Sequence, residues 1–180
     1  MKGIVFTELI EMVEAKWGLE MSDKMLDPEG LSSGGVFTAV GTYPDMDIVI
    51  MLTRLRAETG LSIDQLQNAF GRYLFGTFAR AYGEMLSGID STFSMLSRLD
   101  DFIHPEVRKL YPDAELPGFE IKHRDDSRLE MIYTSSRKMP HFAEGLIYAT
   151  AEHFEEQVQV NWAPLDEDSG IFRFEVVKMP

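Results

Sequence analysis

The spacing of apolar residues changes from a helical to a strand-like period near residue 117, and this change is the strongest constraint on the fold. Before it, apolar side chains recur at helical spacing; after it, they alternate with polar ones in short runs. The expected helices cover about 3–17, 19–26, 48–59, 62–82 and 91–110, the last interrupted by Pro105, followed by strands at 119–122 and 129–135, a helix at 142–154, and strands at 158–162 and 171–177. We therefore predict an α+β fold, in which a mostly helical N-terminal part precedes a ββαββ part with a four-stranded antiparallel sheet.

The helix expected at 62–82 carries two local signals. Ser62 and Gln65 match a capping box, in which each side chain satisfies a backbone amide at the start of the helix. Gly71 and Gly76 each weaken a helix by about 1 kcal/mol relative to alanine. We therefore expect something bulky to pack against the backbone at the glycines.

Composition excludes several classes of protein. The 180 residues, 44% of them hydrophobic, suffice for one domain that buries a core and a ligand cavity. A formal charge of −13 disfavours nucleic acid and anionic membranes as partners. The chain has no cysteine, which excludes disulfides, thiol catalysis and cysteine-ligated metals. No secretory or membrane-spanning segment stands out, so we expect a cytoplasmic protein.

The run Tyr133-Thr134-Ser135-Ser136-Arg137 is a candidate anion site. If the strand continues through it, Tyr133, Ser135 and Arg137 lie on one face. Two hydroxyls and a guanidinium suit carboxylates, because arginine can bind a carboxylate through two parallel hydrogen bonds. The simpler alternative is a solvated face of the sheet.

His104 is the candidate metal ligand among four histidines. It lies between apolar residues and directly before Pro105, so a helix start or a kink should present its side chain rigidly. His123, His141 and His153 show no metal-site spacing, and no nucleophile, dinucleotide or phosphate-loop motif is present. We expect no enzymatic activity. A ligand that needs both a nitrogen donor and a carboxylate clamp is heme.

The motif Tyr133-x-Ser135-x-Arg137 resembles the propionate-binding motif of the heme nitric oxide/oxygen binding (H-NOX, HNOB) domains, relatives of the heme domain of soluble guanylate cyclase. Further matches extend the resemblance over essentially the whole chain. They are Met1-Lys2-Gly3, Phe70-Gly71-Arg72, His104-x-x-Val107-x-x-Leu110-Tyr111-Pro112, Pro117 and Gly145-Leu146-Ile147.

The resemblance implies heme b (iron protoporphyrin IX) as the cofactor, held between the helical part and the sheet part. His104 would be the proximal ligand of the iron, and Tyr133, Ser135 and Arg137 would hold the propionates. Pro117 resembles the family's proline that presses on the porphyrin. The other residues expected to contact the cofactor are apolar: Val5, Leu9, Leu74, Phe78, Phe142 and Leu146. The domain would cover 1–180, with a helical subdomain at about 1–60 and a heme-embracing remainder at about 61–180.

The distal side decides which gas is bound. Family members that bind oxygen stably carry a tyrosine where this sequence has Phe142, assisted by an asparagine and a tryptophan where it has Leu74 and Leu9. An apolar pocket therefore predicts binding of nitric oxide and carbon monoxide with poor affinity for oxygen. Tyr73, Tyr82 and Tyr148 remain alternative donors. Unlike some bacterial relatives, this chain cannot form a cysteine-ligated zinc site.

We expect a gas-sensing protein that binds nitric oxide at a ferrous, His104-ligated heme. As the resemblance implies, nitric oxide would weaken the bond to His104 and shift the N-terminal helices against the sheet part. The signal would pass to a separate protein, such as a histidine kinase or a cyclic-di-GMP enzyme. Two alternatives stay open: an oxygen sensor on the same fold, and a heme-independent interaction module.

Overall fold

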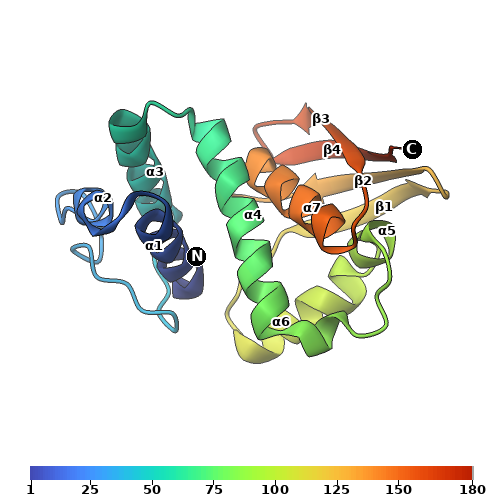
Figure 1. Ribbon diagram of the computed structural model, residues 1–180, viewed down its shortest axis with the longest axis horizontal. Helices are drawn as coiled ribbons and strands as arrows, with labels where there is room; N and C mark the ends of the chain where they lie inside the picture. The colour runs from blue at the N-terminus through green and yellow to red at the C-terminus, as the bar shows by residue number, and fades with distance from the viewer. Residues whose placement is uncertain (180) are drawn as a thin grey trace.

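The computed structural model describes residues 1–179, and Figure 1 shows a long central helix with helices on one side and a sheet on the other. The N-terminal group contains α1 (Gly3–Trp17), α2 (Leu19–Met25) and α3 (Asp45–Thr59). The central helix is α4 (Ile63–Ala81). The expected mixture of helices and a four-stranded antiparallel sheet is confirmed.

The capping signal acts as predicted, and two glycines end helices. The Ser62 hydroxyl accepts a hydrogen bond from the backbone amide of Gln65 at 3.1 Å. The side-chain oxygen of Gln65 in turn accepts one from the backbone amide of Ser62 at 2.9 Å. Gly18 and Gly60 follow α1 and α3 with positive φ angles of 86° and 74°. Glycine adopts this geometry without a steric penalty, which is why the two helices end there.

The region between α4 and the sheet contains several short elements. They are the 3-10 helix η1 (Gly83–Leu86), the helix α5 (Thr92–Leu96), the single π-helical turn η2 (Leu99–Ile103) and the helix α6 (His104–Leu110). His104 is the first residue of α6, and Pro105 lies in its first turn, where its missing N–H costs no hydrogen bond. The prediction of a helix start or kink at His104 is therefore confirmed.

The C-terminal sheet has the strand order β1-β2-β4-β3, with every neighbouring pair antiparallel. Its strands are β1 (Gly118–Arg124), β2 (Arg128–Thr134), β3 (Val158–Asp166) and β4 (Ile171–Lys178). Helix α7 (Pro140–His153) connects β2 with β3. Alternate residues of β2, namely Leu129, Met131 and Tyr133, are buried, and Ala143 and Ile147 of α7 belong to the same core.

One prediction about β2 was wrong. The strand ends at Thr134, so the period of two does not continue to Ser135 and Arg137. A turn follows instead, in which the Ser135 hydroxyl accepts a hydrogen bond from the Arg137 amide at 3.3 Å. Such local side-chain bonds give serine a stable alternative to strand pairing.

Helices α4 and α7 cross in close contact at two glycines. A Cβ atom at Gly71 would collide with the carbonyl oxygen of Phe142, and one at Gly145 with the carbonyl oxygen of Asn68. The expectation of a bulky element against α4 is thus confirmed at Gly71. At Gly76 only the flexible end of Arg80 lies near, at 3.4 Å.

No helix in the described part of the chain is both long enough and apolar enough to cross a lipid bilayer.

Replacing Gly145 by alanine should destabilise the fold. The new methyl group must push α4 and α7 apart, and overpacking of this kind costs about 1–3 kcal/mol. Urea unfolding should show this loss. Gly76→Ala is the matched control, because the same kind of substitution in α4 meets only a movable side chain and should stabilise the helix by up to about 1 kcal/mol. Equal stability of the two variants would contradict the close crossing.

Candidate functional site

A cavity of about 280 Å³ lies between the start of α1, the central helix α4, the α6 segment, the sheet and α7. Ten of the eleven residues expected to contact the cofactor line it: Val5, Leu74, Phe78, His104, Pro117, Tyr133, Ser135, Arg137, Phe142 and Leu146. They come from segments that are far apart in the sequence, so the fold brings the imidazole, the clamp motif and the apolar wall into one site.

Leu9 does not line the cavity. It lies one helical turn beyond Val5 in α1, is fully buried, and belongs to the core formed with the other N-terminal helices. The sequence alone could not separate these positions, because both lie on the inward side of the same helix.

His104 faces the cavity as a neutral imidazole with a fixed orientation. Its side chain is largely buried, and Nδ1 lies 3.0 Å from Oδ1 of Asp100. Burial lowers the pKa of His104 below its ordinary value and outweighs the opposite effect of Asp100. Because a carboxylate only accepts, Nδ1 carries the proton and Nε2 keeps its lone pair. This is the tautomer that binds a metal through Nε2.

Asp100 also ties this segment to the sheet. Its second carboxylate oxygen accepts a hydrogen bond from the backbone amide of Phe119 in β1 at 2.7 Å. The Phe119 ring lies 5.7 Å from the His104 ring, centroid to centroid. One carboxylate therefore fixes the imidazole and joins η2 to β1, a role that the sequence did not reveal because Asp100 looks like part of an ordinary acidic run.

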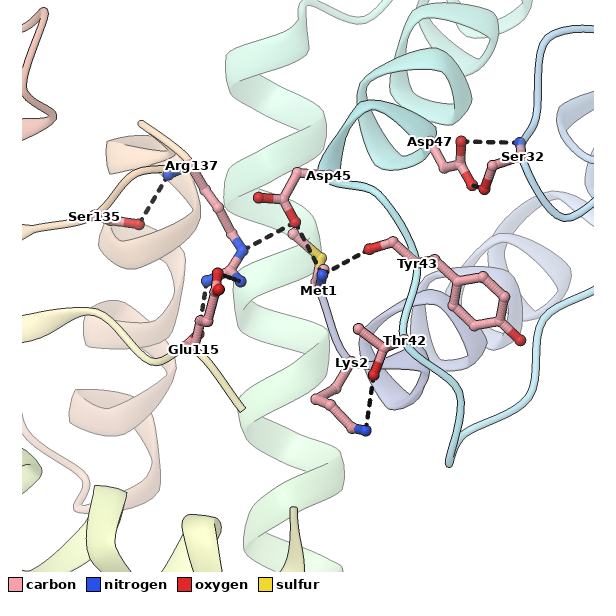
Figure 2. Close-up of polar contacts among 10 residues, drawn as sticks. All are labelled: Met1, Lys2, Ser32, Thr42, Tyr43, Asp45, Asp47, Glu115, Ser135 and Arg137. Atoms are coloured by element: carbon pink, nitrogen blue, oxygen red, sulfur yellow. Dashed lines mark hydrogen bonds and ion pairs between the residues drawn. The ribbon is translucent and has the colours of Figure 1, made fainter. Parts of the chain in front are cut away.

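The clamp residues Tyr133, Ser135 and Arg137 line the cavity around the end of β2 and the turn that follows it. Tyr133 and Ser135 are buried, and burial raises the pKa of Tyr133, so its hydroxyl stays protonated. The Arg137 guanidinium donates to Asp45 at the start of α3 and to Glu115 in the loop before β1 (Figure 2). Neither acid was predicted, because residues so distant in the sequence leave no local signal.

The residues of α1, α4 and α7 that line the cavity form a wall that is apolar apart from Thr150. The rings of Phe70 and Phe142 pack with centroids 5.2 Å apart, and Leu74 and Val5 complete this wall. Of the three tyrosines considered from the sequence, Tyr73 and Tyr148 do not line the cavity and Tyr82 does.

Tyr82 has a neighbouring hydroxyl to bind. Burial, and then the hydrogen bond with Tyr82, raise the pKa of Tyr111, which also lines the cavity, to about 12. Tyr111 therefore stays protonated at neutral pH, with Tyr82 as its hydrogen-bonding neighbour.

The remaining histidines lie outside the cavity. His123 pairs with Asp125, His141 lies between Asp64 and Glu144, and His153 packs against the rings of Phe75 and Phe154. Among residues 1–179, no group of three or more histidine or acidic side chains is arranged to hold a metal ion.

The Haem-NO-binding family model matches residues 2–162. This chain belongs to the Haem-NO-binding (H-NOX) family. It is 39% identical to the H-NOX protein of K. algicida, solved in the unliganded Fe(II) form, with a TM-score of 0.94 over all of this chain and 97% of the other. The H-NOX of Shewanella woodyi, solved in the Fe(II)CO state with IWP-051 bound, is 34% identical, with a TM-score of 0.84 over 100% and 95% of the two chains.

The relation to cyclases covers one part of those proteins. Soluble guanylate cyclase 89Db of Drosophila melanogaster is 25% identical over 156 residues, which are 86% of this chain and 23% of the cyclase. The chain thus spans about a quarter of the length of the curated relatives it matches. H-NOX domains are gas-sensing domains that bind heme, and the cavity residues fit that group: a neutral imidazole with a free Nε2, an apolar wall, and a guanidinium with two hydroxyls for carboxylates.

Asp100→Asn should destabilise the H-NOX fold. Hydrogen bonds to a charged group contribute about 1.5–3 kcal/mol each, and an amide can replace only part of the two that Asp100 accepts from His104 and Phe119. We expect a loss of about 1–3 kcal/mol in urea unfolding. Asp101→Asn is the control, since this exposed neighbour makes no hydrogen bond or ion pair within residues 1–179. An Asp100 variant as stable as the control would show that the carboxylate does not tie these elements together.

Proposed function

We propose that this protein senses nitric oxide through a heme b that is held by His104 and by the Tyr133, Ser135 and Arg137 clamp. The observation that carries the proposal is that one cavity joins an unprotonated Nε2 with a carboxylate clamp and a wall of aliphatic and phenyl groups. Bound heme would supply a ferrous iron that takes a diatomic gas.

His104 is proposed to be the iron ligand on the proximal side. Its low pKa keeps the imidazole neutral at pH 7, and Asp100 holds the ring by Nδ1 while increasing the basicity of Nε2. The clamp is proposed to bind the propionates: Arg137 offers charge and parallel donors, while Tyr133 and Ser135 add hydroxyls. Pro117 lines the cavity and is proposed to press on the porphyrin plane.

The apolar wall supports nitric oxide over oxygen. Oxygen bound to ferrous iron accumulates negative charge and gains from a hydrogen-bond donor, whereas nitric oxide and carbon monoxide bind without one. Phe142, Leu74, Val5 and Leu146 carry no donor on their side chains. We therefore propose that the protein discriminates against oxygen by leaving it without a hydrogen bond.

An oxygen sensor is the second candidate, and Tyr82 is the observation that favours it. Tyr82 follows the end of α4 and lines the cavity, and its hydroxyl is a hydrogen-bond donor. Tyr111, which also lines the cavity, is the hydrogen-bonding neighbour of this hydroxyl. Replacing Tyr82 by phenylalanine would decide whether its hydroxyl stabilises bound oxygen.

The proposed output passes through the α6 segment to a separate protein. His104 begins α6, and its partner Asp100 in the preceding η2 binds the backbone of β1. A change at His104 therefore reaches both the helices and the sheet. We propose that residues 1–60 respond by moving against 61–180. A histidine kinase or a cyclic-di-GMP enzyme would be the partner that reads this change.

The electronic spectrum of the ferrous protein tests the proposal. Nitric oxide should replace the Soret band of the ferrous protein with a new one, and air should give no stable new band before slow oxidation. A stable band formed in air would favour the oxygen sensor. A colourless protein that cannot be reconstituted with hemin would favour a heme-independent interaction module.

Phe142→Tyr should raise the affinity for oxygen. The substitution adds a hydroxyl donor to an otherwise apolar wall, and one hydrogen bond worth about 1.4 kcal/mol corresponds to about a tenfold change in the equilibrium. Oxygen titration of the ferrous variant measures this change. Phe70→Leu is the matched control, because it alters the same wall without adding a donor. An unchanged oxygen affinity in Phe142→Tyr would place the gas site elsewhere.

A further inference from the structure

Two acidic residues bind Arg137 on different sides of its guanidinium (Figure 2). Nε lies 3.3 Å from Oδ1 of Asp45, and Nη2 lies 3.3 Å from Oε2 of Glu115. Nη1 also donates to the backbone oxygen of Glu115 at 2.7 Å. The Arg137 side chain is only 13% exposed, so little of its charge is left to water.

The two acids differ in their relation to the cavity. Glu115 is one of the residues that line it, together with Arg137, whereas Asp45 does not line it. The Glu115 side chain is 80% exposed, while that of Asp45 is 41% exposed and also lies 3.1 Å from the Met1 amine. Glu115 is thus the partner on the ligand side, and Asp45 is the partner on the side of α3.

The negative charges around Arg137 oppose the binding of an anionic ligand. Arg137 already faces two carboxylates, and the whole chain carries a formal charge of −13. A ligand that brings two further carboxylates to Arg137 would place them close to the negative charges of Asp45 and Glu115. The exposed Glu115 side chain can swing into water at little cost, because exposed ion pairs contribute little to stability.

We propose that Glu115 competes with the ligand's carboxylates for Arg137, and that Asp45 positions Arg137 to receive them. This inference rests on the proposed function, in which those carboxylates are the heme propionates. The two acids on one arginine therefore have opposite effects on cofactor retention. Glu115 weakens it through its charge, and Asp45 strengthens it through its hydrogen bond to Nε.

The test measures the rate at which the ferric protein loses hemin to an excess of a heme-scavenging apoglobin at low salt. Glu115→Gln should lose hemin about two- to fivefold more slowly, because a neutral amide competes less well for the guanidinium. Asp113→Asn is the matched control. Asp113 lies exposed in the loop that also holds Glu115 and forms no ion pair in the described chain, and its replacement removes the same negative charge. Equal or faster loss in Glu115→Gln, or the same slowing in Asp113→Asn, would overturn the proposal.

Hemin dimethyl ester, which has no free carboxylates, separates competition from a structural effect. With this probe the difference between Glu115→Gln and wild type should vanish. It should also shrink in 0.5 M salt, because exposed charges are screened. A slowing that persists with the ester would show that Glu115 acts through packing, which overturns the competition.

Substitutions at Asp45 test the positioning role. Asp45→Ala should lose hemin faster than wild type, and Asp45→Asn should lie between the two, because an amide oxygen can still accept from Nε. Hemin loss equally fast in both variants would overturn that role. A wild-type protein that takes up no hemin would overturn the proposed function as well, whereas normal uptake with no effect of Glu115→Gln would overturn this inference alone.

Discussion

The hydrogen bond between Asp100 and His104 is the interaction on which the rest of the site depends. An imidazole in an apolar cavity keeps its lone pair free only if it stays neutral and its other nitrogen has an acceptor. Burial supplies the first condition and Asp100 the second. Because Asp100 also accepts from the Phe119 amide, the orientation of the ring is tied to the first strand of the sheet. A chemical change at Nε2 therefore acts on two structural elements at once.

The central helix α4 shapes the apolar wall of the cavity. Gly71 and Gly145 let α4 and α7 approach closely, and the rings of Phe70 and Phe142 pack against each other beside the cavity. Bulkier residues at the crossing would separate the helices and widen the apolar wall. The same contact connects the N-terminal helices to the sheet part, since α4 packs against both. The packing that forms the largely apolar wall thus also joins the two parts that are proposed to move.

Local sequence signals predicted the fold better than the site. The capping box at Ser62, the start of α6 at His104 before Pro105, and the alternation of β2 each depend on neighbouring residues, so the sequence displays them directly. The end of β2 at Thr134 was missed because the Ser135 turn competes with strand pairing. Asp45, Glu115 and the double role of Asp100 depend on contacts between distant segments, which periodicity cannot show. The cavity residues were found mainly through the family resemblance, and Leu9 shows its limit, because a motif position on a buried helix does not specify which core the side chain joins.

The central claim is that Nε2 of His104 binds the iron, and resonance Raman spectroscopy of the ferrous protein tests it most directly. The iron–histidine stretching band of the wild type should be absent in His104→Gly. It should return when imidazole is added, and shift to lower frequency with ¹⁵N-labelled imidazole. A band that persists unchanged in His104→Gly without imidazole would contradict the account, because another residue would then hold the iron.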